Sequence, residues 1–313
     1  MVNKKKFKKV LVVLGGTSGE RLVSLNTGNA CIKALKSKNY RVSKYDPKFK
    51  SLNSIDKKKF DVIFNALHGK DGEDGIAQSY FEYLRIPYTH SGIFCSHNAM
   101  NKILSKEIFI KNKILTPKYL TINKEKFNFK KTHLLLKKKN INFPVVTKPV
   151  DEGSSLGVKI SKNLNSLHKS TNNLFKKYNQ LILEQYIGGQ EIQVAVLNKN
   201  PIGAIELIPK RSFYDYKAKY TKAANTKHLM PANLNKKDYK KVLQIAKRAH
   251  KALACRGVTR SDFKFFKNKF YLLEINTQPG MTSMSLVPEI ANYCGINFSN
   301  LVEKILLDAS VNK

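Results

Sequence analysis

The chain has 313 residues, of which 42% are apolar, and a formal net charge of +35. This length and composition suffice for a well-buried core in more than one lobe, and no apolar run approaches the roughly 20 residues that cross a bilayer. Val10–Leu14 is shorter than the about 7–15 residues of a signal-peptide core, and the cysteines form no Cys-x-x-Cys pair. We therefore exclude a membrane span, a targeting signal, a disulfide framework and a zinc site, and expect a cytoplasmic protein.

The positive charge comes mainly from lysine, because only seven of the basic residues are arginine. Base reading and bidentate phosphate contacts favour arginine, and here the lysines are spread along the chain beside many asparagines. We interpret the charge as the result of an AT-rich genome, whose codons favour lysine and asparagine at solvated positions. We therefore expect no nucleic-acid partner. A basic nucleic-acid-binding protein is the alternative from another functional class.

Short apolar runs and helical stretches alternate in the first part of the chain. Val10–Leu14 and Asp61–Ala66 predict buried parallel strands, and each is followed by a glycine-bearing loop and a helix, over about 22–37 and 76–84. We therefore predict a small α/β lobe over residues 1–96. In such sheets, ligands bind beyond the carboxyl ends of the strands, where both loops lie.

The predicted central lobe covers residues 97–187. Its sequence indicates helices over 101–112 and within the lysine-rich stretch 124–142, and strands over 143–149, 158–161 and 181–186. The first of these strands ends at Lys148 and leads into the small-residue loop Glu152–Gly157. Backbone N–H groups in such a loop can hold a phosphate that the lysine neutralises, and a plain hairpin turn is the alternative.

The predicted third lobe covers residues 188–313. Strands are expected over 190–197 and 202–208, a helix over 239–254, and a helical tail from residue 287. Residues 211–230 lack core periodicity and are predicted to form a long loop. Two further strands, over 257–266 and 269–275, are joined by Lys267-Asn268, a hairpin turn signal.

Three side chains on this hairpin carry oxygen ligands suited to a metal ion. Asp262 lies two residues after Arg260 on one strand, and Glu274 and Asn276 lie two apart on the next. Because side chains two apart share a face, the hairpin brings Asp262, Glu274 and Asn276 together. Two carboxylates and an amide oxygen are ligands that Mg²⁺ prefers, and a solvated charged face is the alternative interpretation.

Five stretches, in this order along nearly the whole chain, resemble the D-alanine–D-alanine ligases of the ATP-grasp superfamily. They are residues 14–25, 66–69 with 72–75, 148–149 with 152–155, 213–220, and 274–286. The resemblance implies a three-lobed ATP-grasp architecture of the α/β (α+β) class, in which the N-terminal lobe has a Rossmann-like parallel sheet.

The resemblance also implies which residues bind the nucleotide and the metal. ATP would be held by a set of lysines, a serine and two glutamates: Lys102, Lys148, Ser155, Glu184, Glu191 and Lys219. Among them, Glu184 and Glu191 would hold the adenine and ribose groups. Two Mg²⁺ ions, for which Mn²⁺ is a possible substitute, would be bound by Asp262, Glu274 and Asn276.

The implied amino-acid sites lie on the glycine-bearing loops and the last motif. Glu20 would pair with the ammonium of a first D-alanine close to His68, and Ser285 with the backbone at Leu286 would hold the carboxylate of a second. Arg260 and the N–H of Gly280 would face the developing oxyanion. Ser154 and Tyr220 would hydrogen-bond with Glu20 and close the long loop over the site.

The activity implied is ATP-dependent joining of two D-alanine molecules through an acyl phosphate, for peptidoglycan synthesis. Ligases of the same fold that use D-lactate, D-serine or L-amino acids are the alternatives, and Tyr220 beside Lys219 favours D-alanine. By analogy with the family, we also expect a homodimer that contacts its partner through the first lobe.

Overall fold

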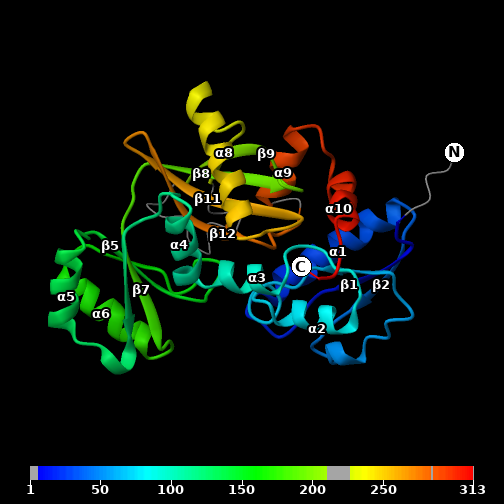
Figure 1. Cartoon of the computed structure of the whole chain (residues 1–313), viewed down its shortest axis with the longest axis horizontal. Coiled ribbons are helices and arrows are strands. Elements are labelled where there is room, and N and C mark those ends of the chain that lie inside the picture. The colour runs from blue at the N-terminus through cyan, green and yellow to red at the C-terminus, as the bar shows by residue number, and fades with distance from the viewer. Residues whose placement is uncertain (1–5, 210–225, 283–284, 313) are drawn as a thin grey trace.

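The structure is a computed structural model that describes residues 6–209, 226–282 and 285–312. Its strands form three sheets, and helices lie against each of them (Figure 1). This mixed arrangement of helices and sheets confirms the predicted fold class. In the described part of the chain, no helix combines the length and the apolar character needed to cross a membrane.

The first sheet is parallel and has the strand order β2-β1-β3. Strands β1 (Lys9–Val13) and β3 (Val62–Asn65) match the two predicted runs, and they are buried as continuous apolar strands. Helices α1 (Arg21–Ser37) and α2 (Ile76–Leu84) follow their glycine-bearing loops. The sequence analysis did not predict β2 (Arg41–Tyr45), an edge strand without fully buried residues.

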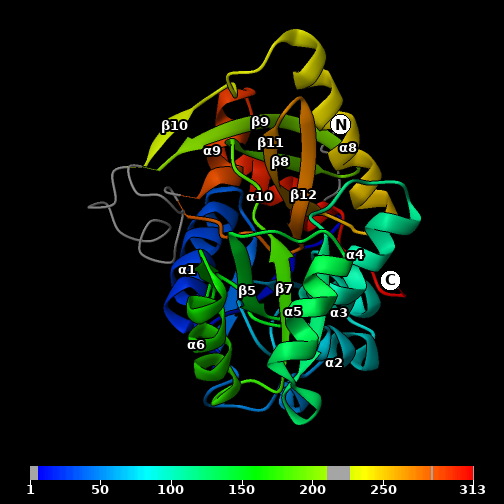
Figure 2. The same cartoon turned by 90° about the vertical axis from the view of Figure 1, so that its left-hand side faces the viewer.

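The second sheet is antiparallel, has the order β4-β7-β5-β6, and is covered by two helices (Figure 2). Its strands are β4 (Tyr119–Asn123), β7 (Gln180–Gln185), β5 (Val145–Pro149) and β6 (Lys159–Ser161). The helices are α5 (Phe129–Lys138) and α6 (Leu164–Phe175), which pack their apolar faces on the sheet. This sheet and its helices have a separate hydrophobic core.

The third sheet is antiparallel and has the order β10-β9-β8-β11-β12. Its strands are β10 (Lys227–Leu229), β9 (Asn200–Ile208), β8 (Gln190–Leu197), β11 (Val258–Phe266) and β12 (Lys269–Asn276). At the hairpin turn Lys267 and Asn268 have φ of 48° and 58°, as the sequence signal predicted. The prediction of a loop over 211–230 is wrong at its end, because β10 pairs there with β9.

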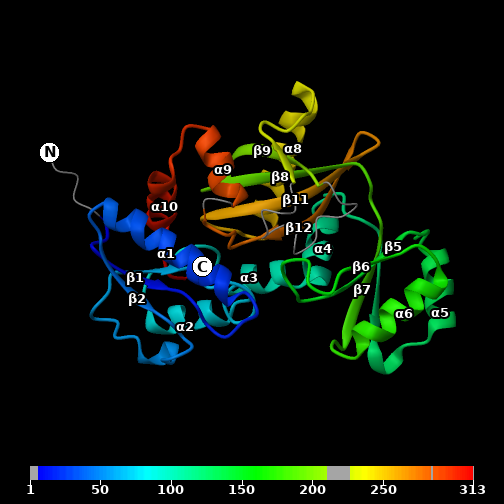
Figure 3. The ribbon, with the colours of Figure 1, turned by 180° about the vertical axis from the view of Figure 1, so that it is seen from behind.

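Helices from distant parts of the chain join the sheets (Figure 3). Helix α8 (Lys236–Ala252) packs on the third sheet, and α9 (Leu286–Tyr293) and α10 (Phe298–Leu307) lie between the third sheet and α1. Helices α3 (Ile93–Met100) and α4 (Lys102–Lys111) pack against β12, and α4 also contacts α8. The lobe boundaries at 96/97 and 187/188 remain predictions.

Candidate active site

Two adjoining cavities contain the predicted site residues that the structure describes. The larger, of about 230 Å³, is lined by Lys102, which was predicted to bind ATP, and by residues predicted to bind D-alanine or metal or to act in catalysis: Glu20, His68, Ser154, Arg260, Glu274, Asn276, Gly280, Ser285 and Leu286. The smaller, of about 100 Å³, is lined by residues predicted to bind ATP and metal: Lys102, Lys148, Ser155, Glu184, Glu191, Asp262 and Glu274. Lys219 and Tyr220 lie outside the described residues.

The two cavities share part of their lining. Lys102, Glu152 and Glu274 line both of them, so the cavities adjoin at one cation and two carboxylates. The Lys102 ammonium donates to the backbone carbonyl of Glu152, and burial lowers the pKa of Lys102 against opposing effects from Glu274 and other acidic groups. A group transferred between ligands in the two cavities would therefore pass a buried cation.

The β11–β12 hairpin positions the predicted metal ligands. Asp262 lies opposite Glu274, and Arg260 lies opposite Asn276, which confirms the predicted juxtaposition of these side chains. A β-bulge follows Asp262, as is common beside active sites. Two carboxylates and an amide oxygen that line adjoining cavities form a donor set suited to Mg²⁺.

Arg260 makes a contact that the sequence analysis did not predict. Its Nε and Nη2 atoms donate to the two carboxylate oxygens of Asp262 at 2.7 and 2.9 Å. The Asn276 amide oxygen accepts from the backbone N–H of Gln278 at 2.8 Å, which fixes the direction of that side chain. Arg260 and Asn276 are therefore held in place by the hairpin itself and by the turn that follows it.

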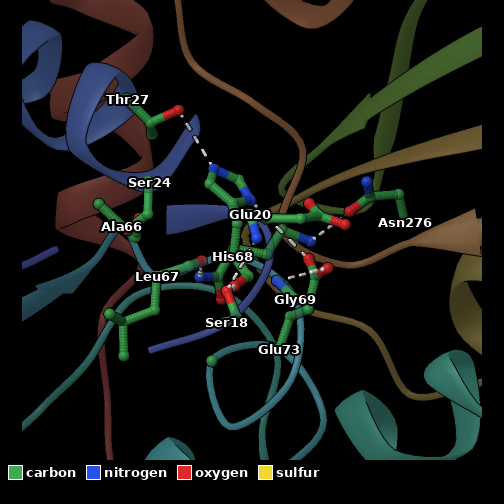
Figure 4. A network of polar contacts seen from close by, with 12 residues as sticks. Ser18, Glu20, Ser24, Thr27, Ala66, Leu67, His68, Gly69, Glu73 and Asn276 are labelled. Carbon is green, nitrogen blue, oxygen red and sulfur yellow. Dashed lines mark hydrogen bonds and ion pairs between the residues drawn. The ribbon is translucent and has the colours of Figure 1, made fainter. Parts of the chain in front are cut away.

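Glu20, His68 and Glu73 form a buried cluster in the larger cavity (Figure 4). His68 Nε2 lies 3.1 Å from the Thr27 hydroxyl, and His68 Nδ1 lies 3.9 Å from Glu73 Oε2. The backbone N–H of Gly69 donates to Glu73 Oε1 at 3.0 Å. Two carboxylates in one buried cluster favour a cationic ligand group. The sequence analysis did not single out Glu73, although it lies in a quoted motif.

Another part of the lining of this cavity suits an anionic group. Ser285 is the N-cap of α9, and its hydroxyl accepts a hydrogen bond from the backbone N–H of Thr282 at 3.0 Å. Leu286 begins the helix, whose N-terminal N–H groups and dipole favour a carboxylate. Gly280 lies so close that a Cβ atom there would come within 3.1 Å of the Ser285 hydroxyl oxygen.

Ion pairs hold two of the glutamates that line the smaller cavity, Glu184 and Glu191. The ammonium groups of Lys106 and Lys148 lie 2.9 and 2.8 Å from the two carboxylate oxygens of Glu184. Burial raises the pKa of Glu184, but the two lysines outweigh it and hold that pKa below its ordinary value. Glu191 accepts from the Lys264 ammonium at 2.9 Å. Lys106 and Lys264 were not predicted as site residues.

Family models and known proteins match this sequence. A family model described as the D-ala D-ala ligase C-terminus matches residues 108–307, and one described as the D-ala D-ala ligase N-terminus matches residues 43–91. A D-alanine–D-alanine ligase from Pelagibacter ubique is 54% identical over 309 residues, which cover 98% of this chain and 99% of that protein.

The structure comparisons give the same family and extend over nearly the whole chain. A D-alanine–D-alanine ligase from Bacillus anthracis, solved in complex with ATP, has a TM-score of 0.83 at 31% identity and covers 96% of each chain. The VanG D-Ala:D-Ser ligase from Enterococcus faecalis has a TM-score of 0.83 at 26% identity, over 95% of this chain and 98% of that one.

Proposed function

This chain belongs to the D-alanine–D-alanine ligase family, and we propose that it joins two D-alanine molecules with conversion of ATP to ADP and phosphate. The observation that supports this most directly is the pair of adjoining cavities, which share the lining residues Lys102, Glu152 and Glu274. One cavity suits a nucleotide and the other suits two amino acids, so a phosphoryl group can pass between them. The product would supply peptidoglycan synthesis.

Joining a carboxylate to an amine in water requires an activated carboxyl group. The first D-alanine would accept the terminal phosphoryl group of ATP on its carboxylate, and the amine of the second would attack that acyl phosphate and release phosphate. Glu20 would bind the ammonium of the first D-alanine, while Ser285 and the α9 N-terminus would bind the carboxylate of the second. Positioning and exclusion of water would supply most of the catalysis, because an acyl phosphate hydrolyses readily.

Charge stabilisation would come from Arg260, the Gly280 N–H and the buried lysines. Arg260 and Gly280 would face the oxyanion formed during amine attack, and Lys102 and Lys148 would contact the ATP phosphates. Asp262, Glu274 and Asn276 would hold Mg²⁺. When bound, Mg²⁺ would neutralise charge on the transferring phosphoryl group. Ser154 would hydrogen-bond with Glu20, and Ser155 and Glu191 would bind the nucleotide.

Two further properties complete the proposed function. We expect the enzyme to act in the cytoplasm, where both ATP and D-alanine are substrates for cell-wall precursor synthesis. A homodimer is expected from the family alone. Light scattering with purified protein tests this, because a monomer across the working concentration range would contradict the dimer.

Phosphate release with Mg-ATP and D-alanine tests the proposal. The control reactions replace D-alanine with D-lactate, D-serine or L-alanine, and each is repeated as a mixture with D-alanine. We expect release with D-alanine alone, and the D-alanyl-D-alanine product in the mass spectrum. D-serine is the competitor of most interest, since one structural relative is named a D-Ala:D-Ser ligase. Release only with a mixture would instead indicate a ligase with a different second substrate.

A further inference from the structure

Lys106 is fully buried, with an exposed fraction of 0%. Its ammonium lies 2.9 Å from Glu184 Oε1 and donates to the Thr116 hydroxyl at 2.6 Å. It also lies 5.7 Å from the centre of the Tyr119 ring. Burying an ammonium group in a protein interior is costly unless it is paired and hydrogen-bonded, so this arrangement needs a specific reason.

Lys106 does not line either cavity, whereas Glu184 lines the smaller one. A ligand in that cavity would therefore meet the carboxylate while the ammonium of Lys106 stays behind it. Lys148 approaches the same carboxylate from the cavity side, at 2.8 Å from the other oxygen, Oε2. One negative charge is thus shared between two positive charges.

The lysines around Glu184 come from two different elements, helix α4 and strand β5. Lys102 and Lys106 are four residues apart on α4, so they lie on one face of that helix. Lys148 and Glu184 lie on the neighbouring strands β5 and β7, where Glu184 is paired with Val146, two residues before Lys148. Helix α4 packs on the third sheet, so Lys106 reaches from that side to a carboxylate of the second sheet.

We infer that Lys106 is a positioning residue for the nucleotide: by sharing the Glu184 carboxylate, it leaves Lys148 a net positive charge for an ATP phosphate. This inference rests on the proposed ATP-dependent function. Without Lys106, Glu184 and Lys148 would form a closed, neutral ion pair. Lys148 would then contribute less attraction to the nucleotide, and the Glu184 carboxylate would lose the contact that fixes its direction.

The test measures nucleotide binding directly, by calorimetric titration with a Mg²⁺ complex of a non-hydrolysable ATP analogue. We compare the unaltered chain with Lys106→Met and with Lys111→Met, which removes an exposed lysine from the same helix. We expect Lys106→Met to raise the Kd for the nucleotide analogue about 10- to 100-fold. Lys111→Met should leave the Kd unchanged.

Steady-state kinetics separate positioning from general damage. In Lys106→Met the KM for ATP should rise by a similar factor, while the KM for D-alanine should change less than about threefold. An equal rise in both KM values, together with a lower thermal midpoint, would indicate a structural role and overturn the inference. An unchanged Kd in Lys106→Met, with normal binding by the unaltered chain, would also overturn it and leave the proposed function intact.

In Lys106→Met the buried Glu184 carboxylate loses one of its partners, and this could cause misfolding. A second variant keeps the inference testable in that case. Lys106→Met with Glu184→Gln removes both charges, so no buried carboxylate is left short of a partner. If Lys106 acts through Glu184, this double variant should bind the nucleotide no more weakly than Glu184→Gln alone. Additive losses would overturn the inference. Absence of nucleotide binding by the unaltered chain would overturn it together with the proposed function.

Discussion

Asp262 and Glu274 lie directly opposite each other across the β11–β12 hairpin, and the Asp262 carboxylate also accepts two hydrogen bonds from the Arg260 guanidinium. The carboxylate that would bind metal therefore already has a cationic partner. Asp262 can turn toward a metal ion only as far as Arg260 allows. Asp262 and Arg260 are thus coupled, because the proposed metal ligand and the residue proposed to stabilise the oxyanion lie on the same strand and contact each other.

Replacing Glu274 with glutamine should strongly slow turnover without unfolding the protein. The change keeps the shape of the side chain but removes one of the two carboxylates proposed to hold Mg²⁺, so we expect at least about a 100-fold lower rate of phosphate release. Circular dichroism should give the same thermal midpoint within about 2 °C, since the side chain is not in the apolar core. Glu125→Gln, at an exposed position, is the matched control and should remain fully active. Full activity of Glu274→Gln would refute the metal assignment.

Replacing Gly280 with alanine should selectively weaken binding of D-alanine. The added Cβ would come within 3.1 Å of the Ser285 hydroxyl oxygen, so Ser285 must move away from its present position. We expect the KM for D-alanine to rise about 5- to 50-fold, comparable to the loss of a hydrogen bond to a charged group. The KM for ATP is the internal control, because Gly280 does not line the smaller cavity. A parallel change in both constants would contradict this role.

Gly15 should be required for stability through its contact with Asp46. It has φ of +87°, and a Cβ there would lie 2.5 Å from the Asp46 carboxylate, which is paired with Arg21 at 2.7 Å. We expect Gly15→Ala to lower the free energy of unfolding by about 1–3 kcal/mol, measured by urea denaturation. Gly19→Ala in the same loop is the control, because a Cβ there meets nothing within 4 Å. Equal stability of the two variants would rule out this explanation.

The affinity for ATP should fall as the pH rises through about 8. Burial lowers the pKa of Lys106 to about 8, against the opposing effect of Glu184, and nearby Lys148 lowers it further while Glu274 raises it. Below that pH the Lys106 ammonium is charged and shares Glu184, whereas above it the neutral amine leaves Glu184 to Lys148. The KM for ATP should therefore rise between about pH 7 and about pH 9.5, a window that brackets this pKa.

The Lys106→Met variant isolates this effect, because its nucleotide site lacks the titrating amine. The other titratable groups around it, among them Glu184, Lys148, Glu274 and Tyr119, are present in both proteins. The ratio of the two KM values, variant over unaltered, should fall toward one as the pH increases. A ratio that stays constant across this range would show that Lys106 does not set the pH dependence.

Much of the fold could be predicted because its elements carry local signals. The buried strands β1 and β3 are continuous apolar runs, and α2 was predicted with its observed bounds, Ile76–Leu84. Strand β2 has the opposite character, because it lies at a sheet edge and none of its residues is fully buried. Helix α6 was not predicted either, because most of its residues are polar, asparagines among them, and only a few apolar residues mark its buried face.

The candidate site was predictable where motifs and strand periodicity specify it. The period of two places Asp262, Glu274 and Asn276 together on the hairpin, and the observed strand register agrees with that placement. The ion pairs behind these residues were not predictable, because they join segments that are distant in sequence. Lys106 meets Glu184 from a helix that packs on another sheet, and no local pattern marks one lysine among so many.

The hydrophobic core that joins the first and third sheets has a consequence for biosynthesis. Helix α1 packs against α10, and Cys31 and Leu35 of α1 share that core with Leu301 and Ile305 of α10. The ribosome makes α10 only after the second and third sheets have been translated. Until then only β1 and β2 cover α1, and the nascent chain exposes the part of α1 that packs on α10 to chaperones and to other chains. The second sheet, whose core is its own, can fold while translation is still under way.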